Sequence, residues 1–360
     1  MMQSLNRYRT LGVLVGVAAA VGCSNGTGPV DDAGFDPARV EASVAAVDRV
    51  SNSAVLRSFQ VLGQHVNGVA ATPSAVASLS GPARFARAVQ GVAGIVVPTG
   101  AALVPVIRSS AYGSTYVYDP ASNRYEPDPS RTGAPADGVR FVLYATSEAT
   151  GRPIVEQEVG YADLRDTRAG AENTLGLSFE VVAGGVTHLQ YDFDLTGSIG
   201  AATFGVEGYL SDGTERVDFD VTTSGQLFGR GGTTTVDGAI SVPSHDFEVM
   251  TRLVGTAGGE SGDGQVELTV RSGPDVIEVT AATTGGQVQA RFTVNGQLLA
   301  TATGDAANPV IRGDGGRELT EPEIHALAAV VGFADGVFRL LAGLLEPAGG
   351  LLLIALGLGA

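Results

Sequence analysis

Two pairs of carboxylates have the spacing best suited to chemistry. Asp192 and Asp194 stand two residues apart, and so do Asp218 and Asp220, in stretches that alternate polar and apolar residues. In a β-strand this spacing puts both carboxylates of a pair on one face, and neighbouring strands could join the pairs into a calcium site or an acid–base pair. Because large apolar residues fill the alternate positions, we favour the simpler interpretation that these aspartates lie on a solvated face.

Other patterns that carry catalysis or bind metals are not assembled in the sequence. No lysine occurs, since all 22 basic residues are arginine, and this excludes a Walker A loop and a Schiff-base lysine. The histidines lie far apart, and none stands in an H-E-x-x-H frame: His65, His188, His245 and His325. The sequence therefore predicts a non-enzymatic protein, without catalytic, cofactor-binding or metal-binding residues.

Composition and charge restrict the possible partners. A hydrophobic fraction of 44% and a charged fraction of only 17% are typical of a packed globular protein rather than of a disordered chain. The net charge of −16 repels nucleic-acid phosphates and anionic lipid surfaces. We therefore expect no nucleic acid as a partner.

The amino terminus has the pattern of a secretory signal. Arg7 and Arg9 precede an uncharged stretch, residues 11–21, which is too short to span a membrane stably. The stretch ends in Ala20-Val21-Gly22-Cys23, which resembles the lipobox of bacterial lipoproteins, although members of that family most often carry leucine where Ala20 stands. Cys23 is also the only cysteine of the chain, so it forms no disulfide within the chain.

This resemblance implies a processed and lipidated protein. Residues 1–22 would be the signal peptide, Cys23 the diacylated first residue, and residues 23–35 a flexible tether. Ser24, rather than aspartate, beside the cysteine implies anchoring in the outer membrane, facing the periplasm. The alternative is an ordinary signal peptide with an incidental cysteine.

Residues 36–110 are expected to form a helical region that packs on a sheet. Asp36 and Pro37 suit an N-cap and a first helical position, and Val40, Val44 and Val47 recur at helical spacing. The sequence predicts a break near residues 51–53 and a second helix that ends near His65.

Residues 111–305 are expected to form an antiparallel β-meander. From Tyr112 onward the hydrophobic period is two, and it predicts eleven or twelve strands, curled or closed into a barrel. The tyrosines at the start of this region are explained by core packing: Tyr112, Tyr116, Tyr118 and Tyr125. Pairs suited to tight hairpins separate several strands: Gly184-Gly185, Asp212-Gly213, Gly285-Gly286 and Asn295-Gly296.

Residues 306–360 are expected to be an apolar helical segment. Thr320 and Glu323 have the spacing of a capping box, with Pro322 in the first turn. Charged residues interrupt the apolar run that follows too often for a transmembrane helix, and the final stretch, residues 349–360, is too short for one.

The predicted fold is thus mainly β with flanking α: a large antiparallel meander covered by amino-terminal helices and an apolar carboxyl-terminal helix. From Tyr112 to Ala360 this layout is similar to periplasmic lipid-carrier half-barrels, such as the lipoprotein-localisation carriers and the mycobacterial lipid-binding lipoproteins. No residue motif of these families is matched, but the similarity implies a cavity for acyl chains. We therefore expect an envelope lipoprotein that binds or carries a lipid or other hydrophobic ligand. The alternative is a structural or adaptor lipoprotein with a self-filled core and a protein partner.

Overall fold

The computed structural model describes residues 37–65, 107–167, 174–198, 201–225, 232–257, 263–305 and 308–321, together with 323, 324 and 327. The expected signal peptide, Cys23 and the tether lie outside these residues. So do residues 66–106 and most of the expected carboxyl-terminal helix. The predictions made for those segments remain predictions.

Two helices precede the sheet, α2 (Pro37–Ser51) and α3 (Ala54–His65). The chain turns between them at Asn52 and Ser53, where the Ser53 N–H donates to the Val50 carbonyl oxygen at 3.1 Å. The Ser53 hydroxyl oxygen then accepts a hydrogen bond from the Leu56 N–H at 3.4 Å. The backbone carbonyl oxygen of Ser53 accepts one from the Arg57 N–H. Ser53 therefore closes the turn that follows α2 and is the N-cap of α3. Each helix buries one stripe of residues against the sheet: Val40, Val47 and Val50 in α2, and Leu56, Phe59 and Leu62 in α3.

The described residues form one sheet of fifteen strands, which follow one another in nearly the same order as in the sequence. The strands are β1 (Ser114–Asp119), β2 (Arg124–Pro127), β3 (Gly138–Thr146), β4 (Pro153–Asp166), β5 (Thr174–Ala183), β6 (Val186–Ser198), β7 (Ala201–Ser211), β8 (Arg216–Gly225), β9 (Gly232–Val242), β10 (Phe247–Ala257), β11 (Gly264–Ser272), β12 (Asp275–Thr284), β13 (Gln287–Val294), β14 (Gln297–Asp305) and β15 (Val310–Gly313).

The antiparallel meander is confirmed, with one exception: β1 pairs with β3 in parallel. The sheet also has more strands than predicted. Gly208 in β7 and Gly238 in β9 interrupt the apolar alternation, so these strands are weak in the hydrophobic pattern. The sheet continues through β15 to Gly313, beyond the expected boundary at residue 305.

Three of the four predicted hairpin turns have two residues in the left-handed conformation that such turns require. Asn295 and Gly296, for example, have φ values of 51° and 78° and connect β13 to β14. Asp212-Gly213 differs, because it belongs to a four-residue turn between Ser211 and Arg216, in which the Asp212 carboxylate accepts the Thr214 and Glu215 N–H groups.

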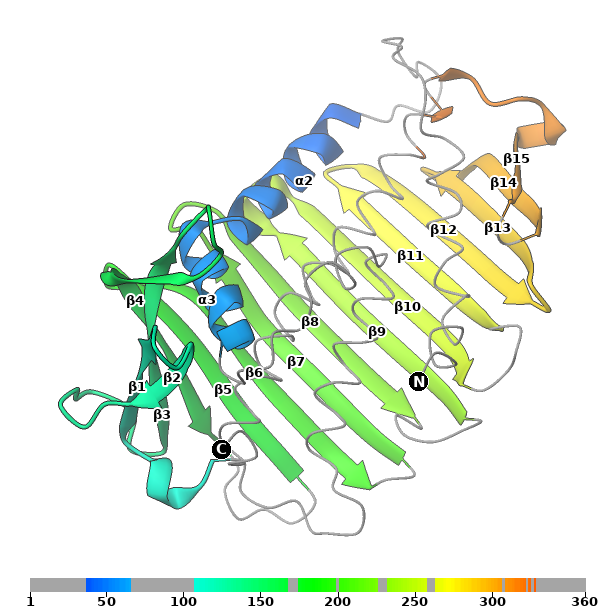
Figure 1. Cartoon of the computed structure of the whole chain (residues 1–360). Helices are drawn as coiled ribbons and strands as arrows, with labels where there is room; N and C mark the ends of the chain where they lie inside the picture. The colour runs from blue at the N-terminus through cyan, green and yellow to red at the C-terminus, as the bar shows by residue number, and fades with distance from the viewer. Residues whose placement is uncertain are drawn as a thin grey trace.

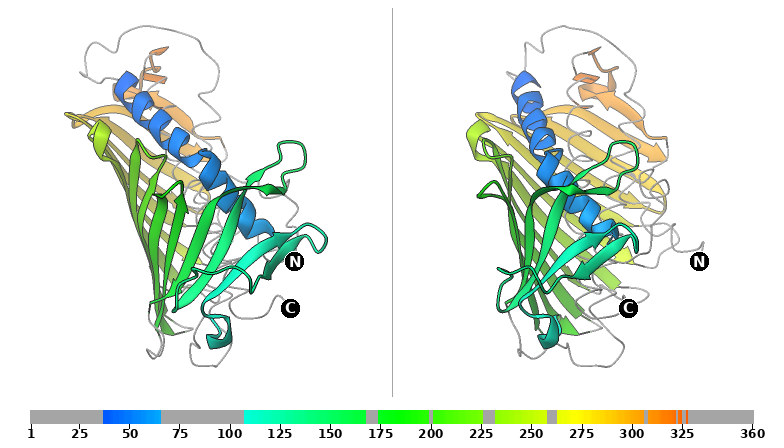
Figure 2. Two further views of the ribbon diagram at one scale, coloured as in Figure 1. Left: turned by 90° about the vertical axis from the view of Figure 1, so that its left-hand side faces the viewer. Right: turned by 60° about the vertical axis from the view of Figure 1, so that its left-hand side comes forward.

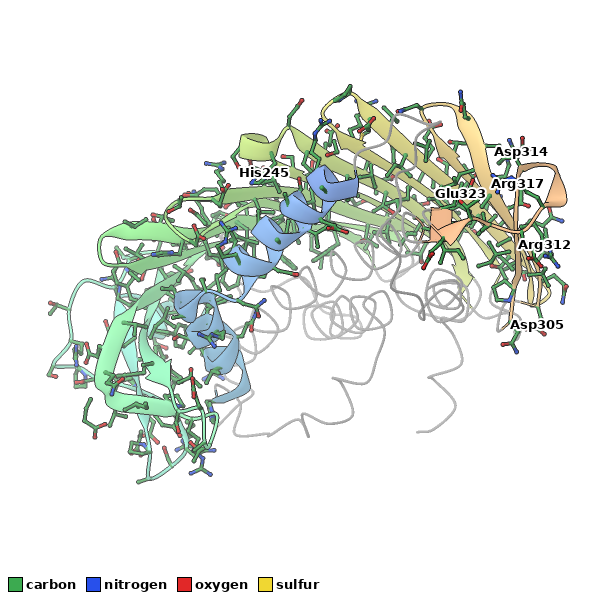
Figure 3. The ribbon with its side chains drawn as sticks, turned by 90° about the horizontal axis from the view of Figure 1, so that it is seen from above. His245, Asp305, Arg312, Asp314, Arg317 and Glu323 are labelled. Atoms are coloured by element: carbon green, nitrogen blue, oxygen red, sulfur yellow. The ribbon has the colours of Figure 1, made fainter. Side chains whose placement is uncertain are left out.

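The sheet is open, so the alternative of a closed barrel is wrong. Its end strands are β2 and β15, and the sheet curves into an arch with α2 and α3 on the concave side (Figures 1 and 3). Both end strands have four residues; β2 ends in Pro127, and β15 carries Arg312. Short strands, proline and charge disfavour pairing at an edge, so these ends are poor partners for each other.

The helices cover part of the concave face. α3 packs on β3 to β6, whereas α2 crosses one end of β7, β8 and β9, as the side views show (Figure 2). Arg39 near the start of α2 reaches the turn between β11 and β12, where it lies 3.6 Å from Asp275 Oδ2 and donates to the Ser272 carbonyl oxygen at 3.3 Å. α2 is therefore fixed along one rim of the arch.

Candidate functional site

The concave face is built from residues that stand opposite one another across β6 to β14. The strand register aligns them in four rows, which we name from the α2 side downward. The upper row is Tyr191, Gly208, Phe219, Ile240, Val249, Val270, Ile277 and Val294. The middle row is Phe193, Val206, Val221, Gly238, Thr251, Leu268, Val279, Phe292 and Ala300.

Two further rows complete the face. The lower row is Leu195, Phe204, Thr223, Val236, Leu253, Val266, Ala281, Ala290 and Ala302. The last, which we call the small-residue rim, is Gly197, Ala202, Gly225, Thr234, Gly255, Gly264, Thr283, Val288 and Gly304. The four rows together form a continuous apolar surface, which is what the alternating sequence pattern demands of one face of a sheet.

Side-chain bulk is uneven over this surface. On β5 to β7, Phe179 stacks on Tyr191 with ring centroids 4.6 Å apart, and Phe193 meets Phe204 edge to face at 4.7 Å. Alanine instead fills three successive lower-row positions on β12 to β14. Aromatic rings thus pack together on β5 to β7, whereas the lower row on β12 to β14 carries only methyl groups.

Threonines interrupt the apolar rows, and two of them have a buried hydroxyl without a partner. The side-chain oxygens of Thr223 in β8 and Thr251 in β10 are buried and have no hydrogen-bond partner, and the two residues are only 2% and 9% exposed. A buried hydroxyl without a partner costs free energy, because its hydrogen bonds to water are lost and not replaced. Of the threonines in the four rows, these two have the buried hydroxyls that no protein group satisfies, so a ligand could satisfy them.

The charged residues of β6 to β14 lie on the other face or at the α2 rim. None of the four rows contains an arginine, histidine or carboxylate. The convex face instead carries cross-strand ion pairs such as Arg252–Asp237 at 3.4 Å and Arg271–Glu248 at 3.6 Å. The concave face therefore suits a neutral, mostly apolar ligand.

The paired aspartates lie on this convex face, as we favoured. Register places Asp192 opposite Glu207, and Glu207 opposite Asp220, so three carboxylates follow one another across β6, β7 and β8. Glu207 was missed in the sequence because only the strand register shows that it lies between the two aspartates. Asp192, Glu207 and Asp220 are exposed, and Asp218 pairs with Arg216 at 2.6 Å. Among the described residues, no group of three or more histidine, cysteine or acidic side chains could hold a metal ion.

The three described histidines lie in separate places. His65 packs edge to face on Tyr118 at 5.3 Å, and burial lowers its pKa. His188 Nδ1 lies 3.0 Å from the Ser211 carbonyl oxygen. His245 Nε2 lies 3.5 Å from Glu215 Oε1, and the other oxygen of Glu215 accepts the Ser244 hydroxyl, so the carboxylate stands between serine and histidine. His325 lies outside the described residues.

Of the four tyrosines before the main sheet, Tyr118 and Tyr125 are part of the core, and Tyr112 and Tyr116 are partly buried against it. Tyr125 is 5% exposed and donates its hydroxyl to the Val142 carbonyl oxygen at 3.1 Å, and Tyr118 donates to Asn123 Oδ1 at 2.7 Å. Tyr116 stacks on Phe141 with centroids 5.1 Å apart. These satisfied hydroxyls differ from those of Thr223 and Thr251.

The predicted capping interaction forms at the last described turn. Glu323 accepts the Thr320 N–H at 2.8 Å, and it also accepts the Thr320 hydroxyl. Arg317 pairs with the same carboxylate beside β14 and β15, and these contacts lower the pKa of Glu323 to about 2 (Figure 3). This carboxylate is fully engaged in structure, so it is not a free group for a ligand.

Comparison of the chain with models of protein families, with curated proteins and with solved structures finds no match. In the part of the chain that the structure describes, no helix has the length and apolar character needed to cross a membrane. Function must therefore be argued from the chain's own residues.

Proposed function

We propose that the protein is a non-catalytic lipoprotein of the bacterial cell envelope that binds or carries a lipid or other hydrophobic ligand on the concave face of its sheet. The observation that carries this proposal is the set of four aligned rows, in which apolar residues and glycine are interrupted only by threonines. The two described helices, of 15 and 12 residues, pack chiefly on β3 to β9, and the apolar rows continue beyond them to β14.

The location follows from the amino terminus. The lipobox-like residues before Cys23 support cleavage there, acylation of the cysteine and anchoring in the outer membrane, with the sheet in the periplasm. The anchor would hold the concave face near a source of lipid, which suits a carrier. Labelling growing cells with a clickable fatty acid tests the anchor: label should enter the wild-type protein and be absent from the Cys23→Ser variant. Equal labelling of both would remove the lipoprotein assignment.

Native mass spectrometry tests the binding function. The full chain with Cys23→Ser, so that no attached acyl chain contributes, is purified without detergent and then extracted with organic solvent. Lipid in a stoichiometric amount, seen both as added mass and in the extract, is the expected result. A clean mass with an empty extract would contradict the carrier.

A second candidate is a structural or adaptor lipoprotein with a self-filled core. One observation favours it: protein atoms alone already bury most of the middle and lower rows, with Leu268 and Val266 each 3% exposed and Phe292 2% exposed. This function predicts no co-purified lipid and a stable protein partner after crosslinking of intact cells. The two experiments together distinguish the candidates.

A further inference from the structure

Thr223 and Thr251 lie on the concave face, in the two rows nearest the small-residue rim. Thr223 stands two residues before Gly225 of the small-residue rim, on the same face of β8. Glycine occupies five of the nine rim positions. A Cβ built at Gly255 or Gly304 would meet no other heavy atom within 4 Å, whereas one at Gly225 would lie 2.2 Å from the Thr233 carbonyl oxygen. The rim therefore leaves space at Gly255 and Gly304, two rows away from Thr251, along the edge of the concave face that is farthest from α2.

The two hydroxyls are arranged diagonally across β9. Thr223 pairs with Val236, whereas Thr251 pairs with Gly238, two residues further along the same strand. With about 4.8 Å between strands and about 3.3 Å per residue, their Cα atoms are roughly 12 Å apart along the sheet. Each hydroxyl would therefore meet a different polar atom of one extended ligand.

The chemistry of the rows selects the polar group. A carboxylate or phosphate placed here would lose its hydration without gaining a cation, because the rows contain no arginine or histidine. A pure hydrocarbon would leave both hydroxyls unpaired. Ester carbonyls and hydroxyls are neutral, and they can pair with threonine as acceptors or donors.

We infer that the hydroxyls of Thr223 and Thr251, beside the small-residue rim, bind the ester and hydroxyl oxygens of a neutral lipid, of which an acylglycerol is the simplest case. The inference rests on the proposed function and specifies its ligand class. It also explains why threonine stands at two positions where valine has the same shape and would lack the unpaired hydroxyl. Stability alone would favour valine at both.

Displacement of a fluorescent probe tests the assignment. The full chain with Cys23→Ser is loaded with N-phenyl-1-naphthylamine, a neutral apolar probe without ester or hydroxyl groups, and titrated with 1-monooleoylglycerol or, at pH 8, with oleate. We expect monooleoylglycerol to displace the probe at lower concentration than oleate. The Thr223→Val, Thr251→Val double variant should weaken that displacement about tenfold while its affinity for the probe stays the same.

Two further variants control for folding and surface effects. Thr280→Val removes a hydroxyl from an exposed position of β12 on the convex face and should change nothing. The Thr223→Ser, Thr251→Ser variant keeps both hydroxyls and should keep the preference for monooleoylglycerol, even if the valine variant folds poorly.

The unfavourable outcomes separate the two proposals. If monooleoylglycerol displaces the probe equally well from the wild type and the valine variant, the hydroxyls have no role and the protein is simply a hydrophobic binder. The same holds if the serine variant loses the preference for monooleoylglycerol as fully as the valine variant does. Failure of the wild-type protein to bind the probe at all would overturn the proposed function and this inference with it.

Discussion

Thr251 on β10 lies directly opposite Gly238 on β9, and a Cβ added at position 238 would lie 3.2 Å from the Thr251 Cγ2 atom. The threonine thus turns its methyl group over the glycine, and its hydroxyl stays buried without a partner. The absence of a side chain at 238 and the conformation of Thr251 are therefore coupled.

This coupling predicts that the effect of Gly238→Ala on the free energy of unfolding has opposite signs with threonine and with serine at position 251. Gly238→Ala should destabilise the wild-type protein by about 1 kcal/mol, since the methyl group of Thr251 must move. In a Thr251→Ser background, which lacks that methyl, the same change should stabilise, because alanine in a strand costs less conformational entropy than glycine. Urea unfolding of the four proteins measures both values. Equal effects in both backgrounds would show that the two positions are independent.

Gly208 is required for a steric reason. A Cβ there would lie 2.1 Å from the Gln190 carbonyl oxygen and 2.5 Å from the Tyr191 Cβ. Because mostly backbone must move to relieve this overlap, Gly208→Ala should destabilise by about 3 kcal/mol or more. Gly205 of the same strand is the matched control, since a Cβ there meets nothing within 4 Å and Gly205→Ala should be near neutral. Similar thermal midpoints for the two variants would contradict the strand register.

The ion pair between Arg140 and Asp163 is the best-formed one in the sheet. Arg140 donates Nε and Nη2 to the two carboxylate oxygens at 2.7 Å and 2.8 Å, its guanidinium lies 3.6 Å from the Tyr161 ring centroid, and Asp163 is 2% exposed at its side chain. The pairing raises the pKa of Arg140. Asp163→Asn leaves the partly buried Arg140 guanidinium without its anionic partner and should lower the free energy of unfolding by about 2 kcal/mol. Asp237→Asn breaks the exposed Arg252–Asp237 pair, and it should change the free energy of unfolding by less than about 0.5 kcal/mol.

Glu323 makes stability depend on pH at the acid end. Its pKa is lowered to about 2 in the folded protein, chiefly by Arg317, so its contribution is full above the ordinary value of 4.5 and is lost as pH falls toward 2. Because Arg317 is 47% exposed, solvent screening limits the effect to about 1 kcal/mol. Unfolding midpoints measured from pH 5.5 to pH 2.5 should fall less steeply in Glu323→Gln than in wild type. Parallel curves would show that Glu323 does not contribute this dependence.

The sequence predicted features that depend on neighbours along the chain. Asn295-Gly296 favours a tight turn wherever it stands, because both residues accept positive φ. Glu323 accepts the Thr320 N–H through the short-range spacing of a capping box. The alternation around Phe219 and Val249 likewise identifies which face of a strand is buried.

What tertiary structure decided is how separate strands are aligned. The apolar alternation places Thr223 and Thr251 at inward positions, but only the register across β9 sets them diagonally beside Gly238 and the rim. The same register put Glu207 between Asp192 and Asp220 on the convex face.

The sequence by itself therefore determined a β-rich meander, its tight turns and its apolar face, because turn conformation and alternation follow from local backbone geometry and side-chain type. Tertiary structure alone decided the open arch, the parallel pairing of β1 with β3 and the position of the two unpaired hydroxyls. These depend on hydrogen bonds and packing between residues distant in the chain, which no local pattern contains.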